Sequence, residues 1–103
     1  MTKMCVGRVG DFSTNSISVH HYRQVRIALF RHGTAFFAVK DRCPHAGDAF
    51  SRGRVEGEQV VCPGHSWMFD LRTGQCLRGD TSCRIRTFRV TVEDDRVWIH
   101  LDD

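Results

Sequence analysis

The chain has 103 residues, of which 41% are hydrophobic and 26% charged, so we expect residues 1–103 to form one globular domain with a single hydrophobic core. Because it has neither the roughly 20 consecutive apolar residues of a membrane-spanning helix nor an apolar leader of the secretory kind, we expect a cytoplasmic protein without a membrane partner. Thirteen arginines dominate the net charge of +3, but they are scattered along the chain and not clustered with aromatic residues. This distribution disfavours nucleic-acid binding. The remaining interpretations of the basic residues are a solvated surface or a docking face for an acidic protein.

The first predicted elements form a hairpin. Residues 24–30 alternate apolar with polar or small side chains, which indicates a strand. The turn at residues 31–34 leads into a second apolar run at residues 35–39. Residues 59–61 predict a short strand that ends directly before Cys62.

The apolar pattern of a later strand is interrupted. Ile85 and Phe88 are out of phase for a regular strand, so we expect a bulge or bend near Thr87. Many short strands separated by turns predict an all-β fold, an antiparallel sandwich or barrel. The remaining predicted strands are residues 67–70, which end in a turn closed by Gly74, residues 84–93 and residues 97–101.

Two segments combine cysteine with histidine, and they contain both prolines of the chain. Cys43-Pro44-His45-Ala46-Gly47 has the spacing C-x-H, and Cys62-Pro63-Gly64-His65 has C-x-x-H. Proline fixes the backbone and lacks an N–H donor, so each segment is expected to be a rigid loop outside a strand ladder. Thiolate and imidazole bind both iron and zinc, but zinc fingers group two cysteines before two histidines, so the mixed loops favour iron–sulfur chemistry. The candidate ligands are Cys43, His45, Cys62 and His65.

With these residues identified, CPHAG…CPGHSWMFDLRTG resembles the motif of Rieske ferredoxins, and the resemblance covers most of the chain. It implies a β-sandwich or barrel with a small cluster-binding subdomain made of two loops, about residues 42–48 and 62–68. It also implies one Rieske [2Fe–2S] cluster per chain. In that arrangement the inner iron is held by Cys43 and Cys62, and the outer iron by His45 and His65.

The sequence departs from one branch of that family. Rieske proteins of respiratory and photosynthetic cytochrome complexes carry two further cysteines, joined in a disulfide, where this chain has Asp48 and Gly64. Trp67 stands where that branch has a serine that donates a hydrogen bond to the cluster. Fewer donors to the cluster sulfurs imply a lower reduction potential. The chain resembles instead the ferredoxins of ring-hydroxylating dioxygenases and the small subunits of NAD(P)H nitrite reductases.

The resemblance implies an electron carrier and not an enzyme, and the sequence contains no recognisable nucleophile or acid–base pair. The expected partners are a flavin-dependent NAD(P)H reductase that supplies single electrons and a terminal oxygenase that accepts them. The alternative is a fixed small subunit bound to the large subunit of a nitrite reductase.

The other cysteines and the aromatic segment after the second loop have structural interpretations. Cys5, Cys76 and Cys83 are expected to be thiols outside the metal site, with a Cys76–Cys83 disulfide or a regulatory oxidation as the alternative. Trp67, Met68 and Phe69 are expected to pack beneath the cluster loops.

Overall fold

The computed structural model describes residues 2–44, 47–64 and 66–101, and the predicted all-β architecture is confirmed in this part of the chain. All strand pairs are antiparallel, and two short 3-10 turns, η1 (Val9–Asp11) and η2 (Phe50–Arg52), interrupt them. Among the described residues, no helix has the length and apolar character needed to cross a membrane. The strands are β1 (Lys3–Arg8), β2 (Asn15–Tyr22), β3 (Val25–His32), β4 (Ala35–Lys40), β5 (Arg54–Glu56), β6 (Gln59–Val61), β7 (Met68–Asp70), β8 (Cys76–Arg78), β9 (Thr87–Phe88), β10 (Val90–Glu93) and β11 (Arg96–His100).

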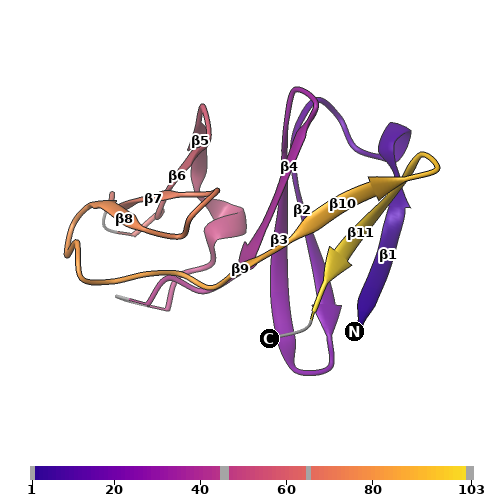
Figure 1. Cartoon of the computed structure of the whole chain (residues 1–103). Helices are drawn as coiled ribbons and strands as arrows, with labels where there is room; N and C mark the ends of the chain where they lie inside the picture. The colour runs from indigo at the N-terminus through magenta and orange to yellow at the C-terminus, as the bar shows by residue number, and fades with distance from the viewer. Residues whose placement is uncertain (1, 45–46, 65, 102–103) are drawn as a thin grey trace.

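The strands form three sheets with the orders β1-β11-β10, β2-β3-β4-β9 and β5-β6-β7-β8. Figure 1 shows the third sheet on one side of the molecule and the other two sheets together on the opposite side. The chain enters the third sheet after β4 and leaves it before β9. The segment between β4 and β9 is therefore an insertion between two strands that are hydrogen-bonded neighbours in the middle sheet.

The middle sheet is buried on both faces, so the expectation of a single core was wrong. Ile27 and Leu29 pack with Val97 in one apolar cluster, between the first two sheets. Phe30 and Val39 belong to a second cluster, which the middle sheet shares with the third sheet. A strand alternates its side chains between two faces, so one buried sheet can serve two cores.

The two-core arrangement explains the interrupted pattern in the C-terminal half. Ile85 belongs to the cluster shared with the third sheet, whereas Phe88 belongs to the other cluster. The strand break lies at Arg89, two residues beyond the expected bend, because β9 pairs with β4 and β10 pairs with β11. The chain therefore changes sheets at this point.

The predicted hairpin is present as β3 and β4, in a register that pairs Phe30 with Phe37. The predicted strand at residues 97–101 is present as β11. Four strands were not predicted, and two of them, β5 and β8, are the edges of the third sheet. The others are β1, which pairs with β11, and β2, which pairs with β3 along its whole length. Both carry mixed apolar and polar side chains, and only their neighbours define them as strands.

Gly53 joins η2 to β5 in a place where no side chain fits. A Cβ at this position would lie 2.2 Å from the backbone oxygen of Val61, although φ of −83° is allowed for any residue. We expect Gly53→Ala to lower the free energy of unfolding by about 1–3 kcal/mol, because the backbone of β6 must move. Urea denaturation measures the effect. Gly10→Ala is the matched control, since a Cβ there meets nothing within 4 Å, and equal stabilities of the two variants would contradict the steric account.

Candidate metal centre

The first candidate loop is closed by two backbone hydrogen bonds at its ends. The amide of Cys43 donates to the carbonyl of Asp48 at 2.7 Å, and the amide of Gly47 donates to the carbonyl of Cys43 at 2.8 Å. Gly47 has φ of +77°, the left-handed conformation that glycine adopts at little cost. Pro44, exposed at the second position, fixes the entry into the loop.

The second candidate loop repeats the same pattern of bonds. The amide of Cys62 donates to the carbonyl of Trp67 at 2.7 Å, and the amide of Ser66 donates to the carbonyl of Cys62 at 3.1 Å. Ser66 occupies the position of Gly47 and has φ of +60°, a conformation that costs a non-glycine residue about 1–2 kcal/mol. The fold therefore presents both cysteines at the start of the same kind of loop, the second one held in a strained turn.

The two cysteines are deeply buried and belong to one apolar cluster. Cys43 is 0% and Cys62 1% exposed, and both pack with Phe50 and Phe69, whose rings meet edge to face at 5.4 Å between centroids. Neither cysteine forms a disulfide. The structure thus brings together two of the four predicted ligands, whereas His45 and His65 lie outside the described residues.

A polar contact joins the two loops. The Cys62 thiol donates a weak hydrogen bond to the Asp48 carboxylate, with 4.0 Å between Sγ and Oδ2. A Cβ on Gly64 would lie 2.2 Å from the same Oδ2, so Asp48 occupies the space that a side chain at position 64 would need. Asp48 and Gly64 are the two positions at which the cytochrome-complex branch has its disulfide. In this chain the Asp48 carboxylate lies instead against the backbone of Gly64.

The second loop is also supported from β8. The Arg78 guanidinium donates from Nε to the carbonyl of Ser66 at 3.1 Å. Gly79, with φ of +126°, lies under the Trp67 indole, and a Cβ there would come within 2.3 Å of Cδ2 of that ring. The prediction that the aromatic segment packs beneath the loops is confirmed for Phe69, which is fully buried, and Trp67 packs against the same cluster.

Cys76 on β8 and Cys83 in the segment that follows β8 lie outside the two candidate loops, and the amide of Cys76 donates to the carbonyl of Cys83 at 3.3 Å. Neither forms a disulfide, and Cys5 is an exposed thiol, so the expectation that all three are thiols is confirmed. Burial raises the pKa of the Cys76 thiol, a hydrogen bond with the backbone of Arg78 partly opposes this shift, and the nearby Cys83 raises the pKa further. Cys76 is therefore a neutral thiol at physiological pH.

Asp41 connects the first loop to the middle sheet, although no motif in the sequence marks it. Its fully buried carboxylate accepts hydrogen bonds from Arg26 Nε and from the amide and hydroxyl of Ser51, all at 2.7 Å. These partners come from β3 and from η2 on the inserted segment. Asp41 thus ties the insertion to the sheet two residues before Cys43.

The donor set fits an iron–sulfur cluster. Two buried thiols start matching loops, and each loop includes one histidine by sequence. Among the described residues no group of three metal-binding side chains is found, and two of the four candidate ligands lie outside them. The apolar surroundings of the two thiols restrict solvent access, a condition that tunes the reduction potential of a cluster.

Comparison with known proteins supports this interpretation. Residues 2–89 match the Rieske [2Fe–2S] domain family. The ferredoxin subunit of a 3-phenylpropionate/cinnamic acid dioxygenase from Photorhabdus laumondii is 38% identical over 78 residues, which is 75% of this chain and 74% of that protein. Relatives of this kind are named as ferredoxin components, which are electron carriers.

Solved structures share the fold over nearly the whole chain. A protein named as the small subunit of an NADPH nitrite reductase is 30% identical with a TM-score of 0.81, covering 98% of this chain and all of that one. A chain in a complex of reduced oxygenase with oxidised ferredoxin, from carbazole 1,9a-dioxygenase, gives a TM-score of 0.88 at 24% identity, covering 95% of this chain and 92% of that one. The chain belongs to the Rieske [2Fe–2S] family.

Proposed function

We propose that this chain carries single electrons on one [2Fe–2S] cluster held by four side chains. Cys43 and Cys62 supply the thiolates for one iron, and His45 and His65 supply imidazoles for the other. The observation that carries the proposal is the pair of matching loops, each of which starts with a buried cysteine and contains a histidine by sequence. We further propose that residues 1–103 act as a single domain in the cytoplasm, where a reducing environment keeps the remaining cysteines as thiols.

Such a cluster supplies reversible one-electron chemistry. Two neutral imidazoles in place of two thiolates make the cluster less negative, which raises its reduction potential to about −150 to +300 mV, against about −400 mV for plant-type clusters. The negative Asp48 carboxylate beside Cys62 favours the lower part of this range.

We propose that the electron passes from a flavin-dependent NAD(P)H reductase to a terminal oxygenase. The identity of 38% with a dioxygenase ferredoxin subunit, over three quarters of both chains, supports this assignment. The test combines the purified protein with the reductase and oxygenase of a 3-phenylpropionate dioxygenase system from which its own ferredoxin has been omitted. We expect substrate-dependent oxygen consumption to be restored. A protein whose cluster is reduced but which supports no turnover would contradict the oxygenase assignment.

A second candidate is the small subunit of an NAD(P)H nitrite reductase, favoured by the 30% identity and the full coverage of such a protein. Size-exclusion chromatography with a nitrite reductase large subunit distinguishes the two. A fixed subunit co-elutes with the large subunit, whereas a shuttle elutes separately and exchanges electrons only in transient encounters.

Replacing Asp48 by asparagine is expected to raise the midpoint potential by tens of millivolts. Reduction adds negative charge to the cluster, and the variant removes a negative charge next to Cys62 at nearly constant volume. Protein-film voltammetry measures the shift. Asp95→Asn, an exposed acid in the turn between β10 and β11, serves as the control. Equal potentials in the two variants would show that Asp48 has no influence on the cluster.

A further inference from the structure

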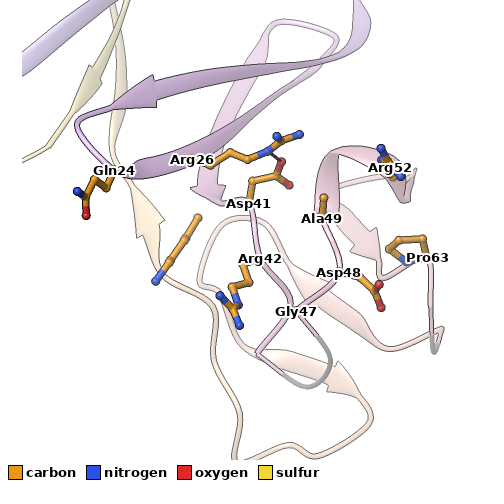
Figure 2. Close-up of a pocket in the computed structure, with 10 residues that line it drawn as sticks. Gln24, Arg26, Asp41, Arg42, Gly47, Asp48, Ala49, Arg52 and Pro63 are labelled. Atoms are coloured by element: carbon orange, nitrogen blue, oxygen red, sulfur yellow. Dashed lines mark hydrogen bonds and ion pairs between the residues drawn. The ribbon is translucent and has the colours of Figure 1, made fainter.

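A basic face runs along the first candidate loop. One cavity is lined by Arg26, Lys40, Arg42 and Arg52, together with residues of both loops (Figure 2). A second cavity shares Lys40 and Arg42 with the first. Two further arginines, Arg84 and Arg86, line that second cavity beside Pro44 of the loop.

The carboxylates near this face leave its positive charge unbalanced. Asp41 is buried and paired with Arg26 at 2.7 Å, so these two charges largely cancel (Figure 2). Asp48 is half-buried and lies against Gly64 of the second loop. The exposed cations Lys40, Arg42, Arg52 and Arg84 form no ion pair with any carboxylate of the described residues.

Three cations elsewhere on the molecule are paired with carboxylates. Lys3 pairs with Glu93 at 2.9 Å, Arg54 with Glu56 at 2.7 Å and Arg72 with Glu58 at 2.8 Å. Other exposed arginines, such as Arg8, Arg89 and Arg96, also form no ion pair among the described residues, so this face is distinguished by the four unpaired cations that lie together beside the first loop. A net charge of +3 understates the local potential at this face.

Arg42 brings this charge directly to the loop. It precedes Cys43, and a Cβ on Gly47 would lie 3.6 Å from both Nε and Nη2 of its guanidinium. The guanidinium is thus packed against the backbone of the loop that holds a proposed cluster ligand. A partner carboxylate bound there would lie next to the route of electron transfer.

We propose that this face is the docking surface for a carboxylate-rich face of the redox partner protein, a proposal that rests on the electron-carrier function above. Complementary charge accelerates encounter and orients two proteins more than it tightens their complex. Among the described residues, no aromatic side chain on which a base could stack lines either cavity, and this favours a protein over a nucleic acid.

The test uses two model partners of opposite charge, a soluble acidic cytochrome b5 domain and basic cytochrome c. The reduced holoprotein is mixed with each oxidised cytochrome in a stopped-flow experiment at low ionic strength. The face variant is Lys40→Gln/Arg42→Gln. The matched control is Arg8→Gln/Arg96→Gln, which removes two exposed cations that face each other in the register of β1 and β11, on the far side from the third sheet (Figure 1).

We expect the face variant to slow electron transfer to cytochrome b5 about tenfold and to accelerate transfer to cytochrome c, since steering changes rates by about 10- to 1,000-fold. The control should change either rate by no more than about twofold. A change in cluster potential alone would move both rates in the same direction, so the ratio of the two rates isolates docking. High salt should abolish the difference. Equal ratios for the face and control variants would overturn the proposal.

Binding of cytochrome b5, measured by calorimetry, separates this proposal from the carrier function. Binding that the face variant loses and the control retains, without electron transfer, would uphold the docking surface and overturn the carrier function. If electron transfer occurs and the face variant does not change its rate, the carrier function would be upheld and the docking surface overturned. Tighter binding of a DNA duplex than of cytochrome b5 at equal ionic strength, lost in the face variant, would overturn the assignment of a protein partner.

Discussion

We expect the replacement of Cys62 by serine to abolish iron binding, and the replacement of Cys43 by serine to do the same. Each residue starts one of the two matching loops, and the thiol of each is buried in the same apolar cluster, where a serine hydroxyl is a poor ligand for iron. With one of four ligands removed, a cluster is exposed to exchange and oxidation. We expect the visible absorption to disappear and the iron and sulfide contents to fall close to zero.

Cys76→Ala is the matched control for these variants. Cys76 is also buried, in the same apolar cluster, but lies on β8 outside the loops and keeps a neutral thiol. Its replacement should lower stability modestly through a small cavity and leave the iron content unchanged. Full iron occupancy in Cys62→Ser, or loss of iron in Cys76→Ala, would show that the ligands are assigned wrongly.

Replacing Asp41 by alanine has the largest expected effect on stability. The variant leaves the Ser51 amide and hydroxyl without their acceptor and the Arg26 guanidinium without its partner. Breaking a buried ion pair costs about 3–5 kcal/mol, but the Arg26 side chain is 48% exposed and can be hydrated, so we expect about 2–4 kcal/mol. For a domain of this size the melting temperature should fall by about 10–20 °C.

Arg26→Gln provides the comparison for that prediction. It removes the half-exposed partner and leaves both Ser51 donors on Asp41, so its cost should be well below that of Asp41→Ala. Thermal denaturation followed by far-UV circular dichroism measures both variants, and visible absorption reports the cluster. Similar melting temperatures for the wild type and Asp41→Ala would mean that Asp41 does not tie the inserted segment to the middle sheet.

Strands with regular alternation or a continuous apolar run could be predicted from the sequence. β11 has apolar residues at every second position, and Val97 and Ile99 face a core, whereas the β3–β4 hairpin is marked by two apolar runs joined by a turn. β1 and β2 could not be predicted, since their mixed side chains are half-buried or exposed and their pairing partners lie far along the chain. When a strand is defined by pairing with a strand that is distant in the sequence, its own residues show no clear apolar pattern from which it could be predicted.

The number of cores was mispredicted for a related reason. Ile27 to Phe30 are all buried, yet their side chains alternate between the two apolar clusters. A continuous apolar run is expected for a strand that is buried on both faces, but it is also expected for other buried segments, so the run alone does not indicate a second core. Only the position of the inserted sheet shows that a second core lies beneath the middle sheet.

The two loops of the site were predictable because cysteine, proline and glycine there have strong individual chemistry. Asp41 and Asp48 were not recognised as structural residues, because one acid in a loop has no periodic pattern to mark it. Their roles depend on contacts with Ser51 and Gly64, ten and sixteen residues further along the chain. Such contacts follow from tertiary structure and not from local sequence.

The most direct test of the central claim is an EPR spectrum of the dithionite-reduced protein, purified without oxygen, together with metal and sulfide analysis. We predict a rhombic signal of a reduced [2Fe–2S] cluster with mixed imidazole and thiolate ligands, and about two irons and two sulfides per chain. An EPR-silent protein that contains one zinc per chain would contradict the account, since the two loops would then form a structural zinc site that carries no electrons.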